Sequence, residues 1–195
     1  MSSYIGKVPT AVPLTSSDIT DGIISVAKLT STLDLSSNTV TLPSGVGGKV
    51  LQVVSSTKTD TFTTTSTSLV DIPSLSVSVT PSSTSNKVFI IGNLSNNTNS
   101  GRIITFQLVR NTTNIANNAS SGNFSGTVSE YINANTNDNI TNSSFSFLDS
   151  PSTTSATTYK IQMMINVGDN TAYINTRPNG DAFQISTITA YEIAG

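Results

Sequence analysis

The chain has 195 residues, of which Ser, Thr and Asn make up 83, while only 10% are charged. It contains no Cys, His or Trp, which excludes disulfides, a Ser–His or Cys–His nucleophile pair and an ordinary zinc site. The net charge of -2 argues against a nucleic-acid groove, which needs clustered Lys and Arg.

Residues 1–45 differ from the rest of the chain and are predicted to form an extended N-terminal arm with a short helix. Pro9 and Pro13 favour an extended segment. The helix is predicted from an apolar stripe at helical spacing, formed by Ile19, Ile23, Val26 and Leu29. A helix this short is marginal alone in water. The stripe must therefore pack on its own domain, against sister chains or within a larger assembly.

A linker follows at 43–48, where one Pro and three Gly stand together. We place the boundary there, so that residues 46–195 form a separate β-sandwich domain. This domain is long enough to bury a core without covalent cross-links.

The second domain has the pattern of successive strands. Apolar residues alternate with polar ones at 75–79, 104–108, 159–167 and 183–193, which indicates strands with one buried face. This alternation predicts that Tyr159 and Tyr191 face the core. The continuous apolar run at 88–91 is typical of a strand covered on both faces. Exposed loops are expected within 93–101, 111–123 and 133–156. Between 111 and 158, short edge strands are expected among these loops at apolar pairs such as Phe145 and Phe147. The fold prediction is an all-β, antiparallel, jelly-roll-like sandwich.

Neither export nor membrane insertion is expected. The N-terminus has no apolar run before its first Lys, and no segment approaches the roughly 20 apolar residues that span a bilayer. The expected place of synthesis is therefore a cytoplasm.

Paired carboxylates are the one catalytic option that the composition leaves open. Glu130 and Asp138 are the candidates, but no sequence signature pairs them. Residues 135–139 and 168–170 contain oxygen ligands suited to calcium, without EF-hand spacing, and both are typical of ordinary Asx turns. We therefore expect no enzyme activity, no metal and no cofactor.

Several segments resemble structural proteins of tailed phages of marine and aquatic bacteria, tail fibres in particular. In the arm they are 4–9, 17–24 and 27–29, which contain a D-G-x-I unit followed by Ala-Lys-Leu. In the second domain they are 48–54, 75–81, 85–88 and 188–193. The resemblance covers most of the chain, although its motifs are loose patterns.

This resemblance implies a non-enzymatic virion component, expected to be a homotrimer without nucleic-acid binding. The arm would attach to other virion proteins, and the β-domain would project outward and meet a host-surface glycan or another receptor. The anchoring residues would be Ile5, Val8, Ile19, Ile23, Val26 and Leu29. A head or tail decoration protein without receptor binding is an alternative. An alternative of another class is an extracellular carbohydrate-binding module, which would need an export route and an exposed aromatic platform.

Overall fold

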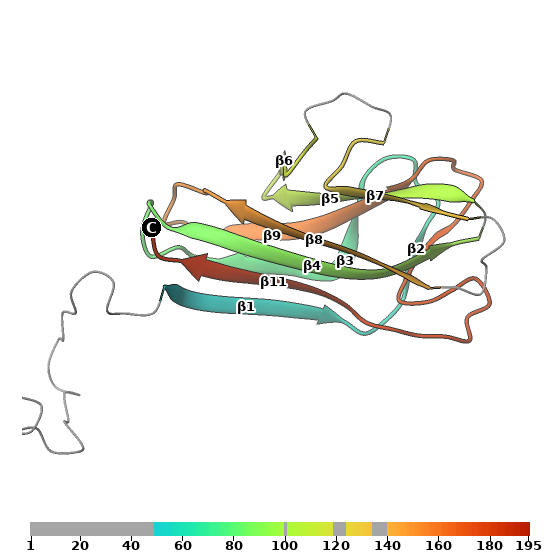
Figure 1. Ribbon diagram of the computed structural model, residues 1–195, viewed down its shortest axis with the longest axis horizontal. Helices are drawn as coiled ribbons and strands as arrows, with labels where there is room; N and C mark the ends of the chain where they lie inside the picture. The colour runs from blue at the N-terminus through green and yellow to red at the C-terminus, as the bar shows by residue number, and fades with distance from the viewer. Residues whose placement is uncertain (1–48, 100, 119–123, 134–139) are drawn as a thin grey trace, which may run out of the picture. The chain divides into compact units, whose positions relative to one another are not determined.

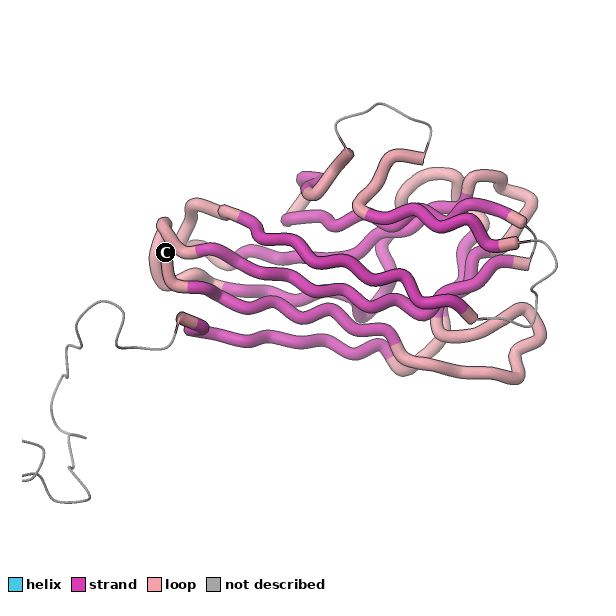
Figure 2. The backbone as a smooth tube through the Cα atoms, viewed as in Figure 1, coloured by secondary structure: helices cyan, strands magenta, loops and turns pink. Residues whose placement is uncertain are grey.

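The computed structural model describes residues 49–99, 101–118, 124–133 and 140–195, and the regular structure within these ranges is entirely β (Figures 1 and 2). The strands are β1 (Val50–Lys58), β2 (Phe62–Thr64), β3 (Val70–Val79), β4 (Lys87–Thr98), β5 (Arg102–Arg110), β6 (Thr113–Ile115), β7 (Val128–Ile132), β8 (Thr141–Asp149), β9 (Thr157–Ile165), β10 (Ala172–Ile174) and β11 (Ser186–Ile193). The predicted arm, its helix and the linker as far as residue 48 lie outside the described residues.

The strands form two antiparallel sheets of four strand positions each. In sheet A (β1, β2, β4, β8, β10 and β11), β11 and β10 pair with successive parts of β4, and β1 and β2 pair with β11 and β10 in turn. Strand β8 pairs along β4 as well. In sheet B (β3, β5, β6, β7 and β9), β9 lies between β3 and β5, while β7 and β6 pair with successive parts of β5.

When the eight positions are numbered along the chain, sheet A has the order 1-8-3-6 and sheet B the order 2-7-4-5. This is the strand order of a jelly roll built from two Greek keys. The predicted fold class, an all-β antiparallel sandwich of jelly-roll type, is confirmed. The last strand runs inside sheet A, between β1 and β4.

The core lies between the two sheets and takes alternate residues from each strand. Sheet B contributes Phe106, Leu108, Tyr159, Ile161 and Met163, and all five side chains are fully buried. Sheet A contributes a row in which Val54, Ala190, Ile90 and Phe147 lie side by side across four strands. The residues that alternate with these side chains form the outer faces; they are serines on much of β3 and include exposed apolar side chains such as Val53 and Leu148 on sheet A.

Two predictions about faces are wrong. Tyr191 does not face the core, because its neighbours Ala190 and Glu192 are the buried residues of β11. The run at 88–91 is buried on one side only, since Val88 and Ile90 enter the core while Ile91 is exposed on the outer face of sheet A. Alternation shows which residues share a face, but it leaves open which face is turned inward.

Two of the expected loops are also corrected. Within 93–101, residues 93–98 belong to β4, and Asn96, Asn97 and Thr98 are buried. Within 133–156, the short edge strand expected around Phe145 and Phe147 is the nine-residue strand β8 at 141–149, whose Ser143 and Asp149 are buried. Side-chain hydrogen bonds satisfy these buried polar groups, so a loop-like composition is compatible with a strand.

Candidate functional site

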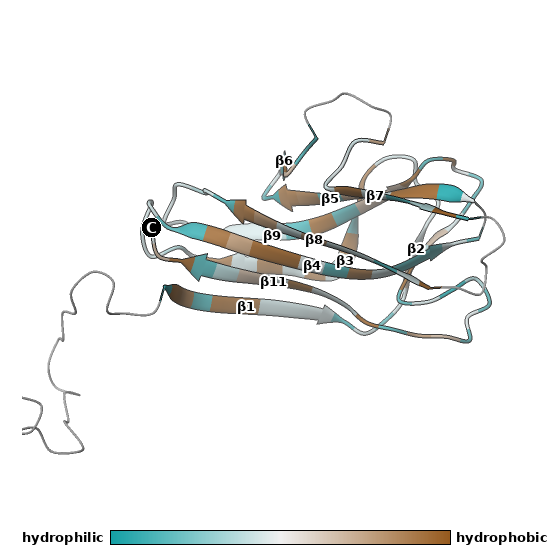
Figure 3. Cartoon of the chain, viewed as in Figure 1, coloured by the Kyte–Doolittle hydropathy of each residue, from teal (hydrophilic) through white to brown (hydrophobic). Residues whose placement is uncertain are grey.

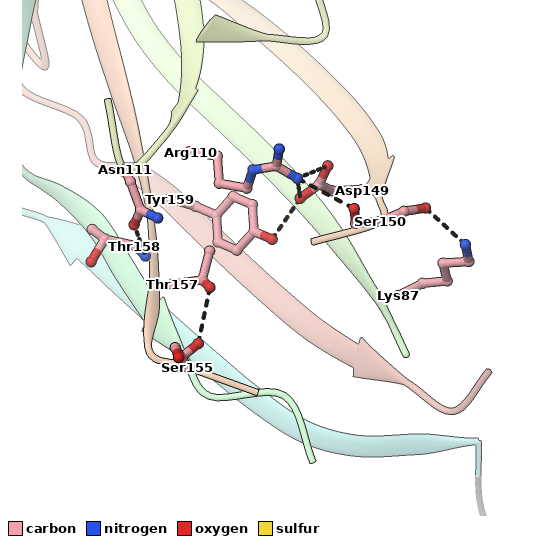
Figure 4. A network of polar contacts seen from close by, with 9 residues as sticks. All are labelled: Lys87, Arg110, Asn111, Asp149, Ser150, Ser155, Thr157, Thr158 and Tyr159. Atoms are coloured by element: carbon pink, nitrogen blue, oxygen red, sulfur yellow. Dashed lines mark hydrogen bonds and ion pairs between the residues drawn. The ribbon is translucent and has the colours of Figure 1, made fainter. Parts of the chain in front are cut away.

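One polar network joins the ends of β5 and β8 across the sandwich (Figure 4). The Asp149 carboxylate accepts hydrogen bonds from Arg110 Nη1 at 3.0 and 2.9 Å, and from the Tyr159 hydroxyl at 2.8 Å. Tyr159 is fully buried, and this burial, together with its bond to Asp149, raises the pKa of its hydroxyl well above the ordinary range. A tyrosine that keeps its proton and a carboxylate held by two donors serve to bridge the sheets rather than to transfer protons.

Glu130, the carboxylate singled out by sequence, also lies in a bridge between sheets. It projects from β7 and accepts hydrogen bonds from the Ser143 hydroxyl of β8 and from Asn96 Nδ2 of β4, the latter at 3.4 Å. Asn96 Nδ2 in turn donates to Ser143 Oγ at 2.9 Å. Asp138, the second candidate carboxylate, lies outside the described residues. The neutral partners of Glu130 give it a structural role in joining β7 to β8 and β4.

A third carboxylate, Glu192, holds the loop between β3 and β4. Its Oε1 accepts hydrogen bonds from the Ser82 backbone N–H at 2.6 Å, the Ser82 hydroxyl at 2.8 Å and Asn86 Nδ2 at 2.6 Å. Burial by itself would raise the pKa of Glu192, but these hydrogen bonds outweigh it and leave the pKa below its usual value. This carboxylate is therefore ionised, and its Oε1 is held by three hydrogen-bond donors.

Of the two candidate calcium segments, 168–170 is the one that lies within the described residues. At 168–170, the Asn170 backbone N–H donates to the Val167 carbonyl at 3.2 Å, as in an ordinary turn. Within the described ranges, no group of three or more His, Cys, Asp or Glu side chains could hold a metal ion. The segment 135–139 lies outside these ranges.

The most distinctive exposed feature is a loop, residues 175–185, that leaves sheet A in the middle of a strand position. Strand β10 ends opposite Asn96 and β11 resumes opposite Asn93, so the chain makes this whole excursion over two residues of β4. We call residues 175–185 the excursion loop. It forms part of the red-orange region at the right of Figure 1. The segment 177–181, with Asn-Gly at 179–180, has the sequence of a turn, but no local pattern indicates that this turn interrupts a strand.

Short-range contacts hold the excursion loop in shape. Arg177 forms an ion pair with Asp181, with Nη2 and Oδ2 at 2.8 Å, and this hydrogen bonding lowers the pKa of Asp181. The Gly180 N–H donates to the Arg177 carbonyl at 2.9 Å, and Gly180 adopts a φ of 65° that favours glycine. An isolated antiparallel β-bridge between Thr176 and Phe183 closes the loop.

Asn175 fastens the base of the excursion loop to the sheet. Its Nδ2 donates to the Lys58 carbonyl at 2.8 Å and the Asp60 carbonyl at 2.9 Å, and its Oδ1 accepts from the Ser186 hydroxyl at 2.6 Å. Its φ of 61° turns the chain out of the strand, and Asn tolerates this conformation better than most residues. The side chain is fully buried.

The excursion loop presents two apolar side chains to solvent: Phe183 is 67% and Ile185 58% exposed. The six predicted anchoring residues, which extend from Ile5 to Leu29, lie outside the described residues, and their role stays a prediction. No helix in the described part of the chain is long and apolar enough to cross a membrane.

No protein-family model and no curated protein sequence matches the chain. It is similar to the solved structure of infectious bursal virus-derived T=1 particles, at 15% identity and a TM-score of 0.36 over 74% of this chain and 36% of the other. The Gt strain of infectious bursal disease virus gives 14% identity and a TM-score of 0.38, over 80% and 42% of the two chains. The VP2 subviral particle of the same virus gives 15% and 0.37, over 86% and 46%.

The chain therefore spans less than half the length of each of these proteins.

Proposed function

We propose that the chain is a non-enzymatic structural protein of a virus particle, a homotrimeric short tail fibre or surface fibre. Its arm, residues 1–45, anchors it to other virion proteins, and the jelly-roll domain projects outward. The observation that carries the proposal is the combination, in one chain, of a fibre-like arm sequence at 4–29 with the jelly-roll strand order. Jelly rolls occur in viral capsid domains and in lectins, so the fold leaves these two functional classes open. The resemblance of the arm sequence to phage fibre proteins favours the virion role.

The arrangement of the carboxylates supports a structural role over catalysis. Asp149, Glu130 and Glu192 each accept hydrogen bonds that join strands or hold a loop. A glycosidase would need two carboxyl groups about 5 Å or 6.5–9.5 Å apart and open to a sugar. Carboxylates fixed in this way favour a rigid scaffold.

The excursion loop is the part of the domain that we assign to contact with a host surface. It is held by Arg177–Asp181 and by Asn175, so its exposed Phe183 and Ile185 are presented without a large ordering cost. Phe183 and the 65%-exposed Tyr131 are also the aromatic side chains best placed to stack on a sugar ring. A host-surface glycan is therefore the ligand that we would test first.

Deletion of residues 1–30 tests the anchor. The proposal predicts that the truncated chain folds, with the β-type circular dichroism and cooperative unfolding of the full chain, but is absent from purified particles when co-expressed with the full-length chain. The control is the F183S/I185S variant, which alters the exposed loop and keeps the arm, so it should enter particles normally. Incorporation of the truncated chain at wild-type level would refute the anchor.

A decoration protein without receptor binding shares the anchor and differs at the loop. In that case F183S/I185S would leave both incorporation and attachment of particles to host cells unchanged. A carbohydrate-binding module would bind glycans as the isolated full chain and be absent from particles altogether. Measuring incorporation and attachment together therefore separates the three possibilities.

A further inference from the structure

An apolar row crosses the outer face of sheet A. Tyr191 of β11 is directly paired with Val53 of β1 on one side and with Phe89 of β4 on the other, and Phe89 is paired with Leu148 of β8. The rings of Phe89 and Tyr191 are in contact, with centroids 6.3 Å apart. The row therefore spans all four strand positions on the side away from the core.

Neighbouring residues widen this row into a patch. Ile193 and its partner Val50 lie on one side of it along the strands, and Ile91 lies on the other. We call Val50, Val53, Phe89, Ile91, Leu148, Tyr191 and Ile193 the apolar face. Figure 3 shows hydrophobic segments on β1 and β4, the two strands that flank β11, in the half of sheet A nearer the C-terminus. Val53 and Leu148 are each 55% exposed.

This outer face of sheet A is almost free of charge. Among its described strand residues Lys87 is the single charged one, and its amino group donates to Ser150 Oγ at 2.8 Å. The polar remainder of the face consists of Ser55, Thr57, Asn93, Asn142, Ser144, Ser146, Thr187 and Thr189. The cores of protein interfaces likewise contain few charged residues and many aromatic ones.

The outer face of sheet B has the opposite character. There Lys160 of β9 forms a 2.8 Å ion pair with Asp71 of β3, and Gln162 donates to the same carboxylate at 2.7 Å. Exposed serines of β3, such as Ser76 and Ser78, lie on this face together with Tyr131 and Met164. The outer face of sheet A therefore differs from it by its near absence of charge, and by an apolar row that crosses all four strand positions.

We propose that the apolar face is where copies of this chain pack against one another. A partner of opposite charge has nothing to recognise on this face, whereas a second copy meets it without repulsion between like charges. The apolar run at 88–91 contributes to both faces of sheet A, since Val88 and Ile90 enter the core while Phe89 and Ile91 belong to the apolar face.

The apolar face is large enough to form the centre of such an interface. Four strand positions and about four residues along each give roughly 20 Å by 13 Å, within an outer face of sheet A of about 500 Å² in projection. Stable interfaces bury about 600–1,000 Å² on each partner, so the contact would also cover the uncharged Ser, Thr and Asn side chains around the apolar face. In a homotrimer, three copies of the face would gather around the common axis. The inference thus gives a location to the oligomer in the proposed function, although its test needs no virus particle.

The test is the mass of the full-length chain in solution, measured by light scattering after gel filtration. The wild type should have at least twice the monomer mass of 20.3 kDa, and three times that mass if it is a homotrimer. The variant V53E/L148E places two charges on the apolar face at half-exposed positions, and should raise the dissociation constant about 100-fold or more and give monomers. The control S76E/S78E adds the same charges to the outer face of sheet B and should keep the wild-type mass.

Folding of each variant is checked by its cooperative unfolding transition. A monomeric wild type at tens of micromolar, or an undiminished V53E/L148E oligomer, would overturn the inference. A second measurement is independent of any destabilisation by charge. Because the chain has no Cys, I91C and S78C each provide a single thiol. A short bis-maleimide should join copies of I91C but not of S78C, and equal cross-linking would contradict the proposal.

Failure here and failure of the proposed function are distinguishable. An oligomer that depends on the apolar face but never enters particles would refute the virion role and leave this inference intact. A monomer found in particles would refute this inference and leave the virion role intact.

Discussion

The aromatic ring of Phe145 lies directly over Gly92, its cross-strand partner between β8 and β4, and occupies the space that a Cβ atom at residue 92 would take. The ring packs against the core of the sandwich, and Gly92 is buried beneath it. Because any larger residue at position 92 would displace the ring, this pair fixes the packing of β8 on β4.

We therefore expect Gly92→Ala to destabilise the domain. Displacement of the Phe145 ring by an added methyl group should lower the free energy of unfolding by about 1–3 kcal/mol, the usual cost of overpacking. Urea unfolding measures this change. Gly168→Ala is the matched control, since an added Cβ there meets its neighbours at 3.5 Å or more. Equal stability of the two variants would contradict the described packing.

Tyr159→Phe tests the bridge between the sheets. The change removes the hydroxyl that donates to Asp149 and leaves the ring in the core, so we expect a loss of about 1.5–3 kcal/mol, as for a hydrogen bond to a charged group. Tyr131→Phe removes a hydroxyl from an exposed ring and should change stability by less than about 0.5 kcal/mol. The prediction is wrong if thermal unfolding shows no difference between these two variants.

Glu192 should make the stability of the fold depend on pH. Its pKa is lower in the folded state than the ordinary value of 4.5, so the unfolded state binds the proton more tightly. Its stabilising contribution is therefore fully present well above pH 4.5 and is lost as the pH falls through the folded-state pKa. Glu192→Gln removes this contribution.

The measurement is the urea midpoint of both proteins between pH 7 and pH 3. The wild type should lose more stability on acidification than Glu192→Gln. A residual slope should persist in the variant, because hydrogen bonds from Lys58 and Lys160 also lower the pKa values of Asp60 and Asp71. Parallel curves for the two proteins would show that Glu192 does not couple the loop at 82–86 to pH.

Asn175→Ala should be the most costly single change at the base of the excursion loop. It removes three hydrogen bonds and places Ala at a φ of 61°, which together should cost about 2–4 kcal/mol. Asn175→Gly tolerates the φ but lacks the same bonds, so its loss should be smaller. The ratio of the two losses, taken from denaturant unfolding, separates backbone strain from hydrogen bonding. A larger loss in the Gly variant would exclude the strain term.

The class of the fold could be predicted because the alternation of apolar and polar residues within a strand is a local sequence pattern. Leu75, Val77 and Val79 alternate with serines, and their burial followed directly from this period. The faces of β11 could not be assigned, since Phe183, Ile185 and Tyr191 form as regular an alternation as Ile188 and Ala190. Only packing against sheet B shows that the second set is buried.

The polar strands were missed for a different reason. Asn96 in β4 and Ser143 in β8 have the composition of loops, and the groups that satisfy them are distant in sequence. Asn96 Nδ2 donates hydrogen bonds to Glu130, 34 residues away in sequence, and to Ser143, 47 residues away. A local pattern carries no sign of such partners, so buried polar strands of this kind emerge only from the tertiary structure.

The central claim, a structural role in a virus particle, is tested most directly by a reconstruction of the purified particle that shows where this chain is placed. The account predicts jelly-roll density on the particle surface, in groups of three, with the apolar faces of the copies turned toward one another. A particle whose reconstruction and protein content both lack this chain would contradict the account.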